Sequence, residues 1–118
     1  QHVVSAIGAI EWAARLFAAG RSPDWDELPE DALPGVFEHD THDCSRFDIA
    51  ETLDSLGAAA RSMAAFADSL TPEEQVVIAV YAEEWVINTT AVIRHALHDA
   101  EHHLLDVRRG IARQKLRR

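Results

Sequence analysis

Four of the seven histidines in the chain lie close together near its C-terminal end, between residues 95 and 109. His98 and His102 are four positions apart, and on a helix such residues have Cβ atoms about 5 to 6 Å apart on consecutive turns. Two imidazoles placed in this way can bind one transition-metal ion, but zinc, nickel or iron requires at least a third protein ligand. A metal site on this stretch therefore needs a ligand from another part of the chain.

A second group of potential ligands lies between His39 and Cys44, where His42 and two aspartates complete a run of six residues. Their spacing matches no defined metal-binding pattern, so a polar loop is the preferred interpretation. Cys44 is the only cysteine, which excludes an internal disulfide and is typical of a reducing compartment. We therefore expect a cytoplasmic protein.

The stretch from His98 to His102 also fits the H-x-x-E-H pattern of inverted zinc proteases, in which Glu101 would be the general base. Those enzymes need a further acidic ligand well downstream. Because only sixteen residues follow His102, the protease interpretation is disfavoured.

The elements that would position these side chains are predicted to be helices. A length of 118 residues indicates one domain, residues 1–118. Alanine and leucine are abundant, glycine is scarce, and the four prolines fall between the periodic segments. We expect an all-α fold, specifically an antiparallel four-helix bundle.

The charge distribution restricts the partners. A formal net charge of −9 argues against binding to nucleic acid or to an anionic membrane, and no apolar run approaches the roughly 20 residues of a membrane span. Six of the eleven basic residues lie between Arg108 and Arg118. Cations there complement the dipole at the end of a helix, so we expect a solvated helix terminus.

Three amphipathic helices are predicted, near His2 to Ala19, Ile49 to Leu70 and Thr89 to Arg113, packed antiparallel. Local signals for helix ends are Gly20, Asp48 with Glu51, Thr71 with Pro72 and Glu74, and Asn88 or Thr89. The apolar stripes are Val3, Ile7, Ile10, Ala14 and Phe17 in the first helix, Ile49, Leu53, Leu56, Ala60, Met63, Phe66 and Leu70 in the second, and Ile93, Leu97, Ala100, Leu104, Val107 and Ile111 in the third.

Two connections separate these helices. Residues 21–47 contain three prolines among acids and predict a long loop that crosses the bundle, pinned by Trp25, Leu28, Leu33, Val36 and Phe37. Residues 76–87 are rich in β-branched and aromatic side chains, so strands or a small hairpin compete there with helix.

On the last helix, His95, His98 and His102 lie well round from the main apolar stripe, together with Ala91 and Leu105. These histidines either form a solvated polar face or face a groove between helices with Ala91 and Leu105 in its wall. Periodicity alone leaves both interpretations open.

The run from His98 to Arg109 resembles the last-helix signature of the DinB-like superfamily. That superfamily includes the DNA-damage-inducible DinB proteins, the YfiT-like proteins and thiol-dependent enzymes related to mycothiol-dependent maleylpyruvate isomerase. The resemblance implies an antiparallel four-helix bundle that binds a divalent metal, commonly zinc or nickel, through three histidines or through two histidines and a carboxylate.

The resemblance also implies a ligand set. The family's first ligand precedes an apolar helix with a tryptophan, which matches His2 and Trp12, and its HxxxH pair corresponds to His98 and His102. The expected metal ligands are therefore His2, His98 and His102. Leu104 and Leu105 replace the glycine and glutamine often found just after the third ligand, which weakens the case for a shared substrate.

A metal held by neutral imidazoles, with one position open, lowers the pKa of bound water toward 7 or stabilises a thiolate. Resemblance to the thiol-dependent members favours a transferase or isomerase reaction with a low-molecular-weight thiol as cosubstrate, and hydrolysis is the alternative. His95, Glu101 and His103 are candidates for orienting groups or for proton transfer. A different alternative is a non-enzymatic helical domain that dimerises and binds metal incidentally or not at all.

The family's first helix has no counterpart in this sequence. Three amphipathic helices leave one groove of a bundle open, so we expect either a further N-terminal helix or a homodimer that covers the groove.

Overall fold

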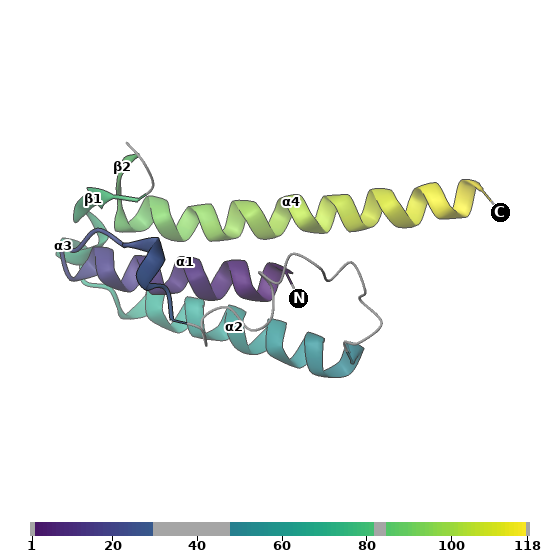
Figure 1. Cartoon of the computed structure of the whole chain (residues 1–118), viewed down its shortest axis with the longest axis horizontal. Helices are drawn as coiled ribbons and strands as arrows, with labels where there is room; N and C mark the ends of the chain where they lie inside the picture. The colour runs from purple at the N-terminus through teal and green to yellow at the C-terminus, as the bar shows by residue number, and fades with distance from the viewer. Residues whose placement is uncertain (1, 30–47, 82–84, 118) are drawn as a thin grey trace.

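The computed structural model describes residues 2–29, 48–81 and 85–117. The predicted ligands between His39 and Cys44, and the predicted loop anchors Leu33, Val36 and Phe37, lie outside the described residues. The elements are α1 (His2–Ala18), a 3-10 turn (Trp25–Glu27), α2 (Ile49–Ser69), α3 (Pro72–Gln75), β1 (Ile78–Val80), β2 (Val86–Asn88) and α4 (Thr89–Leu116), as shown in Figure 1.

The chain is mostly helical, and its three long helices match the predicted ones closely in their bounds. It is not purely α-helical, however. Strands β1 and β2 form an antiparallel hairpin in which Ala79 pairs with Ile87. The hairpin arises where β-branched residues dominate the sequence, and it resolves the choice between helix and strand that periodicity left open.

The residues predicted to mark helix ends lie at the ends of the observed helices. The Asp48 carboxylate accepts a hydrogen bond of 2.9 Å from a backbone N–H in the first turn of α2. Thr71 and Glu74 form a reciprocal capping box at the start of α3, and the Asn88 side chain caps α4. Gly20 has a φ of 74°, a left-handed conformation that ends α1 and that glycine adopts without steric cost.

Helix α1 lies between α2 and α4 and packs against both, whereas α2 and α4 scarcely touch each other (Figure 1). Helices α1 and α4 are antiparallel, as expected. Helices α1 and α2 run parallel, so the prediction that all three are antiparallel is wrong for this pair. About 30 residues separate α1 from α2. At up to ~3.3 Å per residue they can span the length of α1 and return the chain to its starting end.

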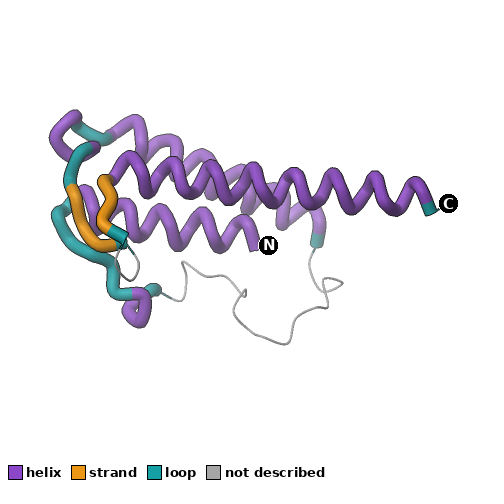
Figure 2. The backbone as a smooth tube through the Cα atoms, turned by 90° about the horizontal axis from the view of Figure 1, so that it is seen from above, coloured by secondary structure: helices purple, strands orange, loops and turns teal. Residues whose placement is uncertain are grey.

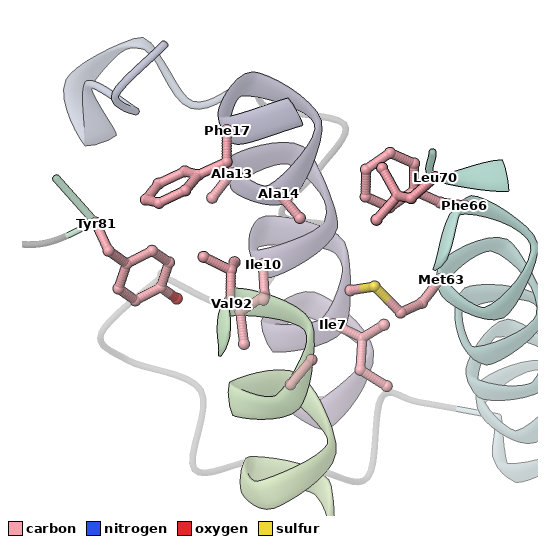
Figure 3. Close-up of a cluster of buried hydrophobic side chains, with 11 residues drawn as sticks. Ile7, Ile10, Ala13, Ala14, Phe17, Met63, Phe66, Leu70, Tyr81 and Val92 are labelled. Atoms are coloured by element: carbon pink, nitrogen blue, oxygen red, sulfur yellow. The ribbon is translucent and has the colours of Figure 1, made fainter. Parts of the chain in front are cut away.

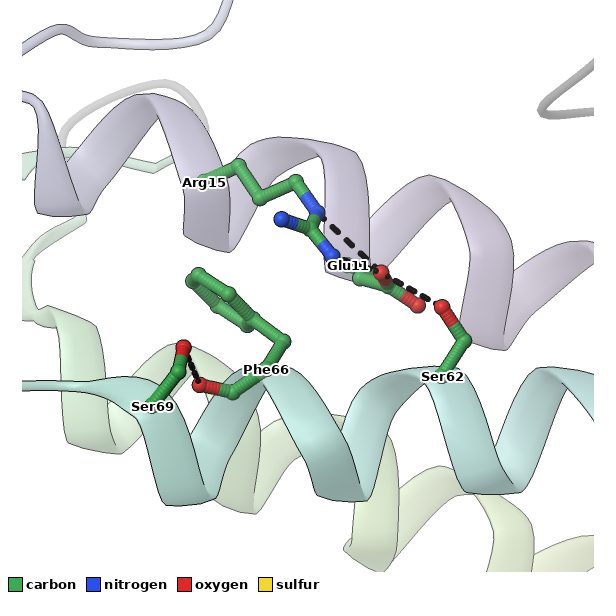
Figure 4. A network of polar contacts seen from close by, with 5 residues as sticks. All are labelled: Glu11, Arg15, Ser62, Phe66 and Ser69. Carbon is green, nitrogen blue, oxygen red and sulfur yellow. Dashed lines mark hydrogen bonds and ion pairs between the residues drawn. The ribbon is translucent and has the colours of Figure 1, made fainter.

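Polar contacts between α1 and α2 show that the two helices run parallel (Figure 4). The Ser62 hydroxyl donates a hydrogen bond of 2.8 Å to the Glu11 carboxylate. Arg15, one turn further along α1, forms an ion pair of 2.7 Å with Glu11 and places its guanidinium 4.6 Å from the centre of the Phe66 ring, one turn further along α2. Residue numbers therefore increase together along both helices.

The core is built around the predicted stripe of α1 (Figure 3). Ala13, Ala14 and Phe17 are fully buried, and Met63, Phe66 and Leu70 contribute the second half of the α2 stripe. The stripe begins exposed, since Ile49 retains 78 % and Leu53 61 % of its surface, and Leu56 is partly buried. The predicted α2 stripe therefore describes the core only where α1 lies beside it.

The predicted stripe of α4 is not the face that packs on α1. Val92 and Ala96 are buried there, because α1 approaches α4 on the side of these smaller residues. The side chains of the predicted stripe are largely exposed, namely Leu97, Leu104, Val107 and Ile111. Of the stripe, Ile93 is partly buried and packs against the core. The apolar stripe therefore reaches the core only at its start.

Figure 2 shows the hairpin, α3 and the 3-10 turn gathered at one end of the long helices. The ring of Trp25 contacts Trp12 and Tyr81, and its Nε1 donates a hydrogen bond of 2.8 Å to the Tyr81 carbonyl oxygen. Trp25 thus anchors the start of the long connection, as predicted. None of the described helices is both long and apolar enough to cross a membrane.

Candidate functional site

The predicted histidine pair lies in the middle of α4. The rings of His98 and His102 are on consecutive turns, with their centroids 4.4 Å apart and their planes at 75°. Both side chains are exposed. The i, i+4 spacing therefore brings the two imidazoles together as expected, on a surface that solvent reaches.

The expected third ligand belongs to a different helix. His2 is the first residue of α1, and the start of α1 lies beside the middle of α4 in both views (Figures 1 and 2). The His2 side chain lies outside the described part of the chain. Among the side chains that are described, no three His, Cys, Asp or Glu residues gather in an arrangement suited to a metal ion.

The side of α4 that faces α1 can be followed along the helix from its buried residues. Two turns after Val92 and Ala96 come Asp99 and His103, which retain 34 % and 35 % of their side-chain surface. His103 Nε2 is 3.7 Å from the Asp99 carboxylate. The side of α4 that packs on α1 thus continues through Asp99 and His103, whereas His98 and His102 lie next to it and are more exposed.

Histidine spacing alone does not predict this second pair. The sequence contains the signal nonetheless. Val92, Ala96, Asp99 and His103 recur at intervals of four, three and four residues, which is the spacing of a single helix face. Small and polar residues on that face made it less prominent than the neighbouring stripe of leucines.

His95, Asp99 and His103 follow one another at intervals of four residues and form one row along α4, with His95 one turn before Asp99. Its Nδ1 is 3.2 Å from the Tyr81 hydroxyl, and its ring meets the Tyr81 ring edge to face with centroids 5.4 Å apart. Trp85 covers the imidazole from another side, with a centroid distance of 6.4 Å. Of the three candidate orienting residues, His95 and His103 therefore share one row with Asp99, while Glu101 is exposed and lies off it.

Tyr81 is the one described group in this region with a strongly shifted ionisation. Burial of the phenol, together with the negative charge of Asp99, raises the pKa of Tyr81 to about 12. At neutral pH the phenol keeps its proton, so it can donate to Nδ1 of His95 whenever that nitrogen is unprotonated. The arrangement fixes the orientation of the His95 ring at the hairpin end of the row.

The described groove between helices can be compared with the groove expected beside the histidines. An apolar groove of about 350 Å³ lies where α2 and α4 diverge, and α4 lines it with Ile93, Ala96, Leu97 and Ala100. The histidine stripe lies on a different side of α4, so the interpretation in which Ala91 and Leu105 line a groove wall beside the histidines is wrong for this groove.

No protein-family model, no curated protein and no solved structure matches the chain.

Proposed function

We propose that the chain is a divalent-metal-binding helical domain of the DinB-like kind, with zinc or nickel held between the middle of α4 and the start of α1. The observation that carries the proposal is the 4.4 Å separation of the His98 and His102 rings on consecutive turns of α4. Imidazole nitrogen is a preferred ligand of both metals. His2 is the first residue of α1, and the start of α1 lies beside the middle of α4 (Figure 1).

The proposed ligands are His2, His98 and His102. Asp99 and His103 are the competing pair on α4, because they have the same i, i+4 spacing and lie on the side that continues the contact with α1. Ring distance favours the first pair, and position relative to α1 favours the second. Either pair together with His2 gives a donor set of nitrogen or of nitrogen and oxygen that suits zinc.

A bound divalent ion would act as a Lewis acid that makes a coordinated thiol or water more acidic. The resemblance to thiol-dependent enzymes supports a transferase or isomerase that uses a low-molecular-weight thiol. In that reaction the chain itself would contribute His95, whose ring contacts the Tyr81 hydroxyl, and His103, which lies 3.7 Å from the Asp99 carboxylate, as imidazoles able to hold or pass a proton.

Elemental analysis of the purified chain after loading with zinc or nickel and exhaustive dialysis tests the proposal. One ion per chain is expected to remain. His2→Ala, His98→Ala and His102→Ala should each lower retained metal toward zero, whereas His39→Ala and His42→Ala should leave it unchanged. Circular dichroism of each variant checks that α4 is still helical.

A matched pair of double variants separates the two ligand sets. If His98→Ala with His102→Ala abolishes binding and Asp99→Ala with His103→Ala does not, the proposed pair holds. The reverse result assigns the ion to Asp99 and His103 and leaves the metal-binding function intact. A wild-type chain that retains no metal, or loop variants that lose it while all the α4 variants keep it, would overturn the proposal.

A second candidate function is a non-enzymatic dimerisation domain. The specific observation in its favour is the exposed apolar stripe along the second half of α4, where Leu104, Val107 and Ile111 each retain about half of their surface. Contiguous exposed apolar surface of this kind is typical of protein interaction sites.

A further inference from the structure

We propose that the groove between α2 and α4 is filled by the second half of α4 from another copy of the chain, in a two-fold symmetric dimer. This inference is independent of metal binding, because the groove and the histidine stripe lie on different sides of α4.

The groove has the shape of a missing helix position. Helix α1 forms its floor through Ile7, and α2 and α4 form its walls without packing on each other. In Figure 3 the side chains of Ile7 and Met63 face one another across the α1–α2 contact. The walls are mostly alanine, including Ala60, Ala64 and Ala100. Small wall residues let the backbone of an incoming helix approach closely, provided that the incoming helix supplies the large side chains.

The second half of α4 supplies such side chains. It projects beyond the start of α1 (Figure 1). Leu104, Val107 and Ile111 lie along one line of it and are 49 %, 58 % and 50 % exposed. This line continues the part of α4 that already lines the groove through Ile93 and Leu97. The first half of α4 therefore lines the groove, and its second half carries the side chains that can fill the groove of another copy.

If the α4 helices of two copies cross antiparallel near Ala100, both grooves are filled and both exposed stripes are covered. The projecting half of each α4 then lies along the groove of the other copy, and the same residues serve on both sides of the axis. Such a self-complementary interface closes after two subunits and leaves no further copy of the groove open.

Charge favours the same partner and the same direction. Residues 104–117 carry five bases and a single acid, whereas α2 carries three acids and one base. In the antiparallel arrangement the basic end of α4 reaches the hairpin end of the other copy. There Thr90 is hydrogen-bonded to the Gln75 carbonyl, which places α3 beside the start of α4. Asp68, Glu73 and Glu74 therefore stand where Arg113, Lys115 and Arg117 of the second copy arrive.

Light scattering coupled to size-exclusion chromatography tests the dimer at micromolar concentration. The wild-type chain should have twice its monomer mass of 13.1 kDa. Leu104→Asp should raise the dissociation constant on the order of a hundredfold or more, because it moves a carboxylate into the apolar groove. Leu105→Asp is the matched control: it is the adjacent residue, 45 % exposed, on another side of α4, and it should leave the mass unchanged.

Charge reversal tests the direction. Arg113→Glu with Lys115→Glu should weaken the dimer, and adding Asp68→Lys with Glu73→Lys to the same chain should restore it. A wild-type monomer at micromolar concentration would overturn the proposal. A dimer that survives Leu104→Asp, or one that Leu105→Asp disrupts equally, would place the interface elsewhere. Failure of the rescue would overturn the antiparallel arrangement.

Discussion

The two ends of the helices are built differently. At the hairpin end, Trp12, Phe17, Trp25 and Tyr81 form a chain of edge-to-face ring contacts with centroids 5.4 to 6.1 Å apart. At the opposite end, the second half of α4 carries no aromatic residue, and every described residue from Leu104 onward is exposed. We therefore expect the hairpin end to contribute most of the stability of the fold, while the other end presents surface.

The candidate metal ligands lie at the boundary between these two regions. His95 is held by Tyr81 and Trp85 at the ordered side, and His102 is exposed at the other. The pair of His98 and His102 on α4 keeps its spacing at such a boundary while remaining open to solvent and to a small substrate. Functional groups are commonly found where a stable scaffold meets an accessible surface.

The strongest test of the comparison is truncation of an aromatic ring at the hairpin end. Phe17→Ala removes a fully buried ring that contacts Tyr81, and it should lower the free energy of unfolding by about 3–5 kcal/mol. Leu116→Ala, at a residue 87 % exposed at the other end, should change it by less than about 0.5 kcal/mol. Urea denaturation followed by circular dichroism measures both. Equal effects of the two changes would mean that stability is spread evenly over the helices.

The helices themselves could be predicted because their signals are local. Asp48, Thr71 and Asn88 bond to backbone N–H groups within three residues of themselves, and Gly20 needs only its own backbone freedom. Parallel packing of α1 and α2 is not local, because it depends on the path of a long connection. The buried face of α4 is not local either. It is Val92 and Ala96 rather than the leucine stripe because α1 lies on that side, and hydrophobicity alone ranks the two faces in the wrong order.

The candidate site likewise has one part that local sequence predicts and another that depends on distant contacts. The closeness of the His98 and His102 rings follows from helix geometry, so spacing predicted it. The contact between His95 and Tyr81 joins a residue of α4 to the hairpin, and nothing in the pattern of either segment links them. Asp99 lies on the side of α4 that meets α1, and only the burial of Val92 and Ala96 identifies that side.

A second test measures how well the hairpin end excludes solvent from the Tyr81 ring. Tyr81 is the only tyrosine, so phenolate absorbance reports on it alone. Its midpoint of ionisation should lie near pH 12, compared with 10.0 for the ordinary group, mainly because of burial and secondarily because of the charge of Asp99. Asp99→Asn should lower that midpoint by removing the smaller contribution. A native midpoint at 10 would show that solvent reaches the ring.

The same shift has a consequence for stability. Because the pKa of Tyr81 is higher in the folded chain, the folded state binds more protons between pH 10 and about 12. The contribution of the neutral phenol is complete below pH 10, and it is lost as pH rises through about 12. The free energy of unfolding should therefore fall across this window, and Tyr81→Phe should remove that part of the pH dependence.

The smallest expected effects come from one substitution made at each end, and they should have opposite signs. Gly20→Ala places a Cβ on a residue with φ of 74°, so it should destabilise the chain by about 1 kcal/mol. Gly110→Ala lies in the second half of α4, where a Cβ would meet no other atom within 4 Å, and it should stabilise the helix by about 0.5–1 kcal/mol. Denaturation measures the first change. Hydrogen exchange of the amides after residue 104, followed in the dissociated chain, measures the second, because this half of the helix packs on no core of its own chain and can open without global unfolding. Slower exchange confined to those amides is expected, whereas slower exchange throughout α4 would show that its two halves open together.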